Sequence, residues 1–124
     1  MLSRKNKNNN LIWLTISLAK DKMQAPISIA GTMIDPGSRT TINIPLANLY
    51  THTKMTIPIK VLHGRKKGPR LFICGTIHGD EINGLEIIRR LIKLKKVKDL
   101  KGTLIAVPVV NVYAFVHNSR YSPD

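Results

Sequence analysis

Apolar and polar residues alternate along the first half of the chain, and this pattern predicts β-strands. Two stretches, "ISIAGTMIDPGSRTTINIPL" from residue 27 and "KMTIPIKVLHG" from residue 54, are rich in β-branched residues and carry prolines. Because proline cannot donate to a sheet ladder, these stretches predict short strands at or near sheet edges. The Asp-Pro-Gly triplet at residues 35–37 predicts a turn, and so does "RKKGPR" at residues 65–70. The first part of the chain is therefore expected to be mainly β.

The hydrophobic period changes twice in the second half of the chain. "LFICGT", residues 71–76, is an unbroken apolar run typical of a strand covered on both faces. From Glu81 onward, Leu85, Ile88 and Ile92 recur at helical spacing, which predicts an amphipathic helix of three to four turns. "TLIAVPVV", residues 103–110, predicts a second buried strand. Strand, helix and strand form a βαβ unit with parallel pairing, so the fold class is α/β with a β-rich lead-in.

The charge balance is strongly basic, with 20 Lys and Arg against 7 acidic residues and a formal net charge of +13. Such a balance raises nucleic acid, acidic membranes and anionic substrates as partners. Seven of the cations lie in residues 89–101, along and after the predicted helix, where they favour a solvated face. With only three Tyr, two Phe and one Trp, base stacking is disfavoured, and no specific nucleic-acid partner is expected. A non-catalytic basic module that binds through residues 89–101 remains an alternative.

The cysteine content and the length of the apolar runs indicate in which cellular compartment the protein is expected. The single Cys74 excludes an internal disulfide and suits a reducing compartment, so we expect a cytoplasmic protein. Its position inside a predicted strand favours a buried small hydrophobe over a reactive thiol. The longest apolar N-terminal run, "LIWLTISLA", has nine residues, too few to span a membrane, and no membrane partner is expected.

The segment "GTIHGDEING", residues 75–84, carries the candidate chemistry. His78 and Glu81 follow the predicted strand at its carboxyl end, the edge at which open α/β sheets bind ligands. Imidazole nitrogen and carboxylate oxygen are zinc ligands, and Gly75 and Gly79 would let the backbone bend and leave room for a substrate. The spacing alone is a weak signal, because a His and a Glu at a helix start also serve as a cap or a surface pair.

The wider sequence resembles the succinylglutamate desuccinylase/aspartoacylase family of zinc-dependent amide hydrolases, which are related in fold to zinc carboxypeptidases. The resemblance rests on "GPRLFICGTIHGDEINGLEIIRRLI", "LKGTLIAVPVVNVYAF" and "NSRY", and it covers about residues 27–124. It implies that His78 and Glu81 bind one Zn²⁺ and that Arg120 polarises the scissile carbonyl or holds substrate. Many relatives have Asn-Pro where this chain has Asn111-Val112, a departure that affects one turn.

The polar, Asn- and Lys-rich start of the chain and the extent of the resemblance together divide the sequence. Residues 1–24 are expected to be an N-terminal extension, and residues 25–124 the N-terminal part of a catalytic domain with a truncated zinc-carboxypeptidase-like mixed sheet. The substrate implied is a small anionic N-acyl amino acid or similar amide. A carboxypeptidase acting on peptides is the related alternative.

Family members supply a third zinc ligand, a His, and a Glu general base after the Asp-Leu-Asn-Arg motif that follows the matched region. We therefore expect little activity from the isolated chain. His52, His63 and His117 do not match that third ligand, and each is expected to be a surface or hydrogen-bonded histidine. A half-sheet also leaves an uncovered edge, so we expect self-association of the truncated chain.

Overall fold

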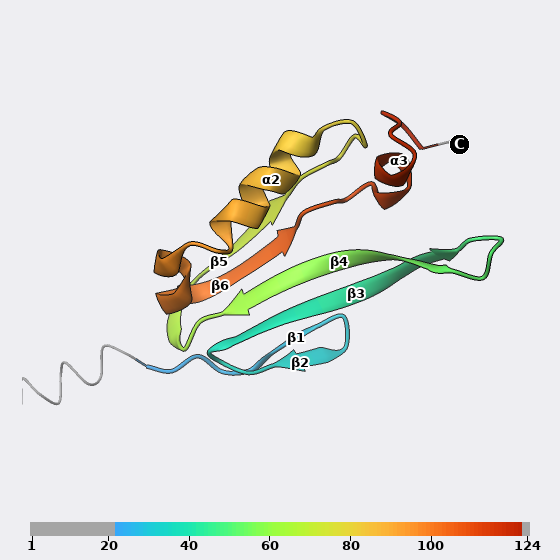
Figure 1. Ribbon diagram of the computed structural model, residues 1–124. Coiled ribbons are helices and arrows are strands. Elements are labelled where there is room, and N and C mark those ends of the chain that lie inside the picture. Colours follow the sequence, from blue (N-terminus) through green and yellow to red (C-terminus); the bar gives the residue numbers. More distant parts are fainter. Residues whose placement is uncertain (1–21, 123–124) are drawn as a thin grey trace, which may run out of the picture.

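The computed structural model describes residues 22–122 and shows an α/β fold built on one mixed sheet (Figure 1). Four strands are hydrogen-bonded in the order β3-β4-β6-β5, and β1 and β2 form a separate hairpin. The elements are β1 (Ile27–Ile29), β2 (Thr32–Ile34), β3 (Ser38–Asn48), β4 (Lys54–His63), β5 (Lys66–Cys74), α2 (Ile82–Leu91), the 3₁₀ helix η1 (Lys95–Asp99), β6 (Lys101–Val107) and α3 (Val112–Val116). The expected N-terminal extension lies almost entirely in residues 1–21, outside the described part.

The predicted turn at Asp35-Pro36-Gly37 is confirmed and starts the long β3–β4 hairpin. Gly37 has a φ of 83°, a left-handed conformation that suits glycine, and its N–H donates to the carbonyl of His63 at 2.7 Å. β3 and β4 then pair antiparallel from Ser38 opposite His63. The β1–β2 hairpin lies beside β3 in Figure 1 and packs against the core cluster, whose buried members are Ile34, Ile42, Ile59, Val61 and Val107.

The prediction that the proline-bearing strands are short and near edges is only partly right. β3 is an edge strand, but it is 11 residues long, and the 10-residue β4 lies inside the sheet. Pro45 is accommodated at a register irregularity between Pro45 and Ala47. Pro58 lies on β4 before the segment that pairs with β6, because that pairing involves only residues 60–63 of β4. The missing N–H of Pro58 therefore costs no ladder bond to β6.

The predicted turn at residues 65–70 is mostly wrong, because strand β5 already begins at Lys66. The register between β5 and β6 shifts between Lys66 and Arg70. A Cβ on Gly68 would lie 2.5 Å from the backbone carbonyl carbon of Lys101, so glycine allows the two backbones to approach. The residues typical of turns serve here to let an irregular strand pack closely against its neighbour.

The two apolar strands of the βαβ unit pair in parallel, as predicted, but they differ in burial. β6 is largely buried between β4 and β5. β5 forms the edge, where Leu71 is 56% exposed and Phe72 is 60% exposed. The prediction that this run is covered on both faces is therefore wrong within the described residues, and Cys74 is exposed rather than buried. An unbroken apolar run in the sequence indicates only that a strand is apolar, whereas its burial depends on which other segments cover it.

Helix α2 follows the predicted apolar spacing and is slightly shorter than expected. Its ten residues make just under three turns, and it lies along β5 in Figure 1, with Ile88 buried and Leu85 half-buried. After Ile92 the backbone bonds tighten to the i−3 carbonyl, and the chain turns into η1. Among residues 22–122, no helix is long and apolar enough to cross a membrane.

The outer face of α2 carries a compact ion-pair cluster. Arg89 donates through Nε to Glu86 Oε2 at 2.5 Å, and Arg90 donates through Nε to Glu86 Oε1 at 2.7 Å. These hydrogen bonds, Arg89 first and Arg90 second, lower the pKa of the Glu86 carboxyl to about 2. A lowered folded-state pKa stabilises the helix above the unfolded pKa near 4.5, and this contribution disappears as the pH falls through about 2.

The Glu86 carboxyl is therefore expected to titrate near pH 2 in the folded chain. Carbon-detected NMR of the Glu86 side chain measures this midpoint directly. In the Arg89→Gln/Arg90→Gln double variant the midpoint should rise toward 4.5, because both donors are lost. The Arg70→Gln variant, which changes a β5 cation that is no partner of Glu86, serves as the control, and an equal rise there would contradict the assignment.

Candidate metal centre at the end of strand β5

His78 and Glu81 converge in the loop between β5 and α2. His78 Nδ1 lies 2.9 Å from Glu81 Oε1, and the two side chains are 33% and 49% exposed. Glu81 occupies the N-cap position of α2, yet its side chain makes no cap hydrogen bond. The sequence alternative in which this carboxylate caps the helix is therefore not realised, and the geometry fits either an ion pair or two ligands of one cation.

The chemistry and spacing of the two atoms are compatible with zinc. A tetrahedral zinc with bonds of about 2.0–2.2 Å holds neighbouring ligand atoms about 3.4 Å apart. Nδ1 and Oε1, at 2.9 Å, would therefore have to separate only slightly to share one ion. Within residues 22–122, no group of three or more His, Cys, Asp or Glu side chains is arranged to hold a metal. The described residues thus offer two coordination positions.

Thr76 shapes the loop that presents these groups. It is 2% exposed and has a φ of 49°, an uncommon conformation for a β-branched residue. Its hydroxyl donates to the carbonyl of Glu81 at 3.1 Å, and the Glu81 N–H donates to the carbonyl of His78 at 3.1 Å. These bonds wind residues 76–81 into a tight turn and place both candidate ligands on it.

Gly75 and Gly79 have a different role from the one predicted. Neither has a positive φ; instead, both are sites of close backbone approach. A Cβ on Gly79 would lie 2.2 Å from the backbone carbon of Ala114 and 2.3 Å from the carbonyl oxygen of Ser119. The space beside Gly79 is therefore filled by the chain itself rather than left for a substrate. This packing brings the segment after α3 against the candidate site.

Arg120 reaches the same loop from forty residues further along the chain. Its Nη1 lies 3.4 Å from Asp80 Oδ1 and 3.5 Å from Glu81 Oε1. A hydrogen bond to the Tyr121 hydroxyl and the charge of Asp80 raise the pKa of the Arg120 guanidinium, which stays cationic throughout the usual pH range. The structure thus assembles all three predicted site residues, although the catalytic role of Arg120 remains a prediction.

Two further residues of the cluster were not identified from the sequence. Tyr121 places its ring 5.5 Å from the His78 ring in an edge-to-face arrangement, and Arg120 Cζ lies 5.7 Å from the centre of the same ring. Asp80 holds Arg120 through its carboxylate. In the sequence, the one indication that Tyr121 lies at this site was its position next to Arg120 in "NSRY". Its contact with His78 depends on the fold.

The departure at Asn111-Val112 produces a helix start. Asn111 is the N-cap of α3, and its Oδ1 accepts a hydrogen bond from the Ala114 N–H at 3.0 Å. Val112 is the first helical residue, a position that also tolerates proline. Replacement of proline by valine is therefore compatible with the same local structure.

Two of the other histidines contact different groups. His63 is 2% exposed, and its ring nitrogens lie 2.8 Å from Thr103 Oγ1 and 2.9 Å from the carbonyl of Ala25. His117 contacts the Tyr113 ring with 4.4 Å between ring centres. The prediction of a hydrogen-bonded histidine is confirmed for His63.

Substitution Gly79→Ala is expected to destabilise the fold by about 1–3 kcal/mol, the usual cost of overpacking, because the new methyl would overlap fixed backbone atoms. Thermal unfolding measures the loss, and amide chemical shifts should change across residues 114–121. In Gly31→Ala, where the space is open and only a positive φ is strained, shifts should stay within the β1–β2 hairpin. Unchanged shifts at residues 114–121 in the Gly79 variant would contradict the packing role.

Comparison with known proteins finds sequence similarity over the part of the chain that carries these residues. The profile of the Succinylglutamate desuccinylase/Aspartoacylase catalytic domain matches residues 67–124. The N-alpha-acetyl-L-2,4-diaminobutyric acid deacetylase of Halomonas elongata is 34% identical over 67 residues, which cover 54% of this chain and 19% of that enzyme.

Solved structures show the same similarity at the level of the fold. A succinylglutamate desuccinylase/aspartoacylase from Rhodobacter sphaeroides aligns with a TM-score of 0.60 at 26% identity, over 82% of this chain and 31% of that one. The product-bound ectoine utilization protein of Ruegeria pomeroyi aligns with a TM-score of 0.60 at 27% identity, over 84% and 31%. The chain thus spans less than a third of the length of these relatives. Over residues 67–124 the chain thus matches the catalytic domain of the succinylglutamate desuccinylase/aspartoacylase family, and its fold is similar to that of solved members of this family.

Proposed function

We propose that this chain is the N-terminal part of a zinc-dependent hydrolase that cleaves the amide bond of a small N-acyl amino acid. The observation that carries the proposal is the convergence of His78 Nδ1 and Glu81 Oε1, 2.9 Å apart, where β5 ends. Arg120, 3.5 Å from the same carboxylate oxygen, adds a permanent positive charge to the site. The similarity to the desuccinylase/aspartoacylase catalytic domain and to a deacetylase supports this chemistry over the alternative of a peptide carboxypeptidase.

The residues of this chain would have distinct roles in that reaction. His78 and Glu81 would hold the zinc, which supplies Lewis-acid chemistry and lowers the pKa of water next to it. Arg120 would donate hydrogen bonds to the scissile carbonyl oxygen or to an anionic group of the substrate, since a guanidinium offers forked donors. Asp80 would orient that guanidinium, and Tyr121 would limit the positions open to both the His78 ring and Arg120.

The proposed substrate class follows from the relatives and from the charge of the site. One relative is named for deacetylation of an acetylated diaminobutyric acid. Arg120 in this chain suits a substrate with a carboxylate or another anionic group. The family resemblance implies a third zinc ligand and a general base that are not among the described residues, so we expect the 124-residue chain itself to hydrolyse such amides very slowly.

We also propose a cytoplasmic location. Cys74 is the single cysteine of the chain and is exposed. Exposed thiols without a disulfide partner in the chain are typical of proteins in reducing compartments.

Zinc binding tests the two ligands directly. Titration of the chain with Zn²⁺, followed by the NMR signals of its histidine rings, should shift His78 first, with weak affinity because only two described ligands are available. Substitution of His78 by Ala or Glu81 by Gln should abolish this shift, whereas the matched His117→Ala variant should retain it. Zinc that shifts His117 or His52 with no response at His78 would contradict the assignment.

Hydrolysis of N-acetyl amino acids tests the expected incompleteness. With zinc in excess, the 124-residue chain should release acetate no faster than the His78→Ala variant, because the family resemblance implies a general base that follows the matched region. Zinc binding at His78 together with rapid, His78-dependent hydrolysis would show that the chain already contains a complete site.

The open edge of the sheet supports the proposed self-association. Leu71 and Phe72 on β5 are more than half exposed, and among the described residues the only pairing of β5 besides that with β6 is a single antiparallel bridge between Met23 and Lys66. Exposed apolar edge strands tend to pair with other chains.

Sedimentation velocity should show concentration-dependent dimers or larger species, and Phe72→Lys should shift the distribution toward monomer. The Tyr50→Lys variant, in the distant β3–β4 loop, should leave it unchanged.

A further inference from the structure

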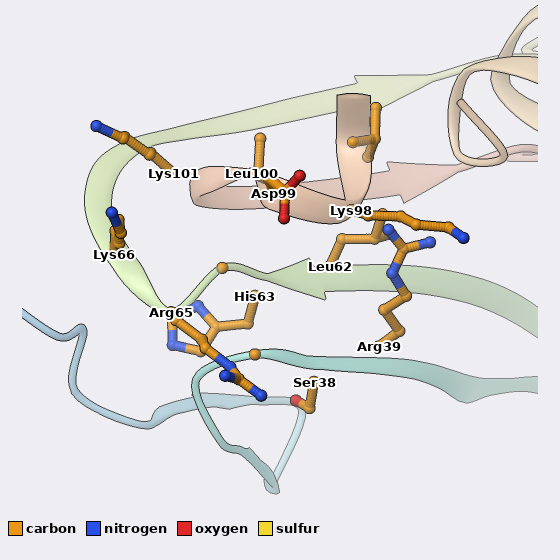
Figure 2. A pocket seen from close by; sticks show the side chains of 13 residues that line it. Ser38, Arg39, Leu62, His63, Arg65, Lys66, Lys98, Asp99, Leu100 and Lys101 are labelled. Atoms are coloured by element: carbon orange, nitrogen blue, oxygen red, sulfur yellow. The ribbon is translucent and has the colours of Figure 1, made fainter. Parts of the chain in front are cut away.

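A basic pocket lies at the end of the sheet away from the His78–Glu81 pair. It has a volume of about 510 Å³ and opens between the start of β3, the end of β4 and the η1–β6 connection (Figure 2). Lys101 at the start of β6 lines it, whereas Val107 at the end of β6 pairs with Cys74, just before the candidate metal centre. Six residue steps of strand, about 20 Å, therefore separate the two regions. The pocket is a separate feature of the molecule.

Cationic side chains dominate the lining. Arg39 comes from β3, Arg65 from the β4–β5 turn and Lys98 from η1, and Lys66 and Lys101 complete the set. Asp99 is the one carboxylate that lines the pocket. Figure 2 shows Arg39 and Lys98 at one end, Lys66 and Lys101 extending outward at the other, and Arg65 and Asp99 between them. Three segments far apart in the sequence thus bring their positive charge to one concavity.

The walls of the pocket are held in place by backbone packing. The Gln24 side-chain amide donates to the carbonyls of Gly64 and Gly102 at 2.6 and 2.9 Å, which ties the β4–β5 turn to the start of β6. A Cβ on Gly64 would lie 1.9 Å from the Leu100 carbonyl oxygen, so these backbones are in close contact. Buried His63, which is within hydrogen-bond distance of Thr103, also lines the pocket. These contacts fix the backbone from which Arg65, Lys66 and Lys101 extend, so no backbone reordering is needed when a ligand binds.

One cation also connects the pocket to the helix layer. Arg39 donates through Nη1 to the carbonyl of Ile92 at 3.3 Å, at the C-terminal end of α2. A guanidinium has five N–H donors, so this bond positions Arg39 and leaves it able to bind an anion as well. The arginine at this edge is therefore oriented rather than free to rotate.

We propose that this pocket binds a compact polyanion of the pyrophosphate class, a small molecule carrying two or more phosphate or carboxylate groups. Its volume is that of a small-molecule site, and cations at both ends suit two separated anionic groups better than one. Guanidinium groups bind phosphate and carboxylate oxygens through paired donors. A nucleic acid is a poorer fit, because no Phe, Tyr or Trp lines the pocket to stack a base, and the lining ring of His63 is only 2% exposed.

Calorimetric titration of the 124-residue chain with pyrophosphate, at constant ionic strength, tests the proposal. Saturable binding of one equivalent is expected. Each exposed charge contributes about two- to fivefold in affinity, so Arg65→Gln/Lys98→Gln should weaken binding about fourfold to twenty-fivefold. The matched control Arg70→Gln/Lys54→Gln removes one arginine and one lysine outside the pocket and should change affinity less than twofold.

Asp99→Asn tests the same site in the opposite direction, with little risk to folding because the side chain is exposed. Removal of this carboxylate should strengthen pyrophosphate binding about two- to fivefold. Equal weakening by the two double variants, no saturable binding, or no gain in Asp99→Asn would overturn the proposal. So would a single-stranded oligonucleotide that binds more tightly than pyrophosphate and is insensitive to Arg65→Gln/Lys98→Gln, since that result indicates binding by net charge.

Discussion

The parallel register of β5 with β6 is the constraint on which the candidate site depends. The two strands are aligned through Cys74 opposite Val107. The alignment continues past the strand ends, because the Gly75 N–H donates to the Val107 carbonyl and the Asn111 N–H donates to the Thr76 carbonyl. The two chain segments therefore leave the sheet side by side. A slip of one residue would turn every side chain of β5 to the other face and separate these exits.

This alignment explains how residues far apart in sequence share one cluster. The loop after β5 carries His78 and Glu81, and the segment after β6 and α3 carries Arg120. Gly79 lets the second segment pack directly against the first, at distances that exclude any side chain. The strain at Thr76 is held by the surrounding hydrogen bonds, as is common where a loop presents functional groups.

The same topology gives the molecule two chemically different ends. At the carboxyl ends of β5 and β6, carboxylates and an imidazole lie together with one guanidinium. At the opposite ends, five cations surround a pocket with one carboxylate. The net charge of +13 conceals this division, because a sum over the chain carries no information about position. The five cations line one pocket only because the fold brings segments that are far apart in the sequence together at this end of the sheet.

The sequence by itself determined the α/β class, the helix after Glu81, the Asp-Pro-Gly turn and the candidate ligands, because these depend on local spacing and on the chemistry of neighbouring residues. It did not show that β5 lies at an edge with Cys74 exposed, nor that residues 66–70 belong to a strand, because burial and pairing depend on distant segments. The contacts of Tyr121 with His78 and of Arg120 with Asp80 likewise required the fold. Only tertiary structure decides which local features become neighbours, since that choice follows from strand register and close backbone packing.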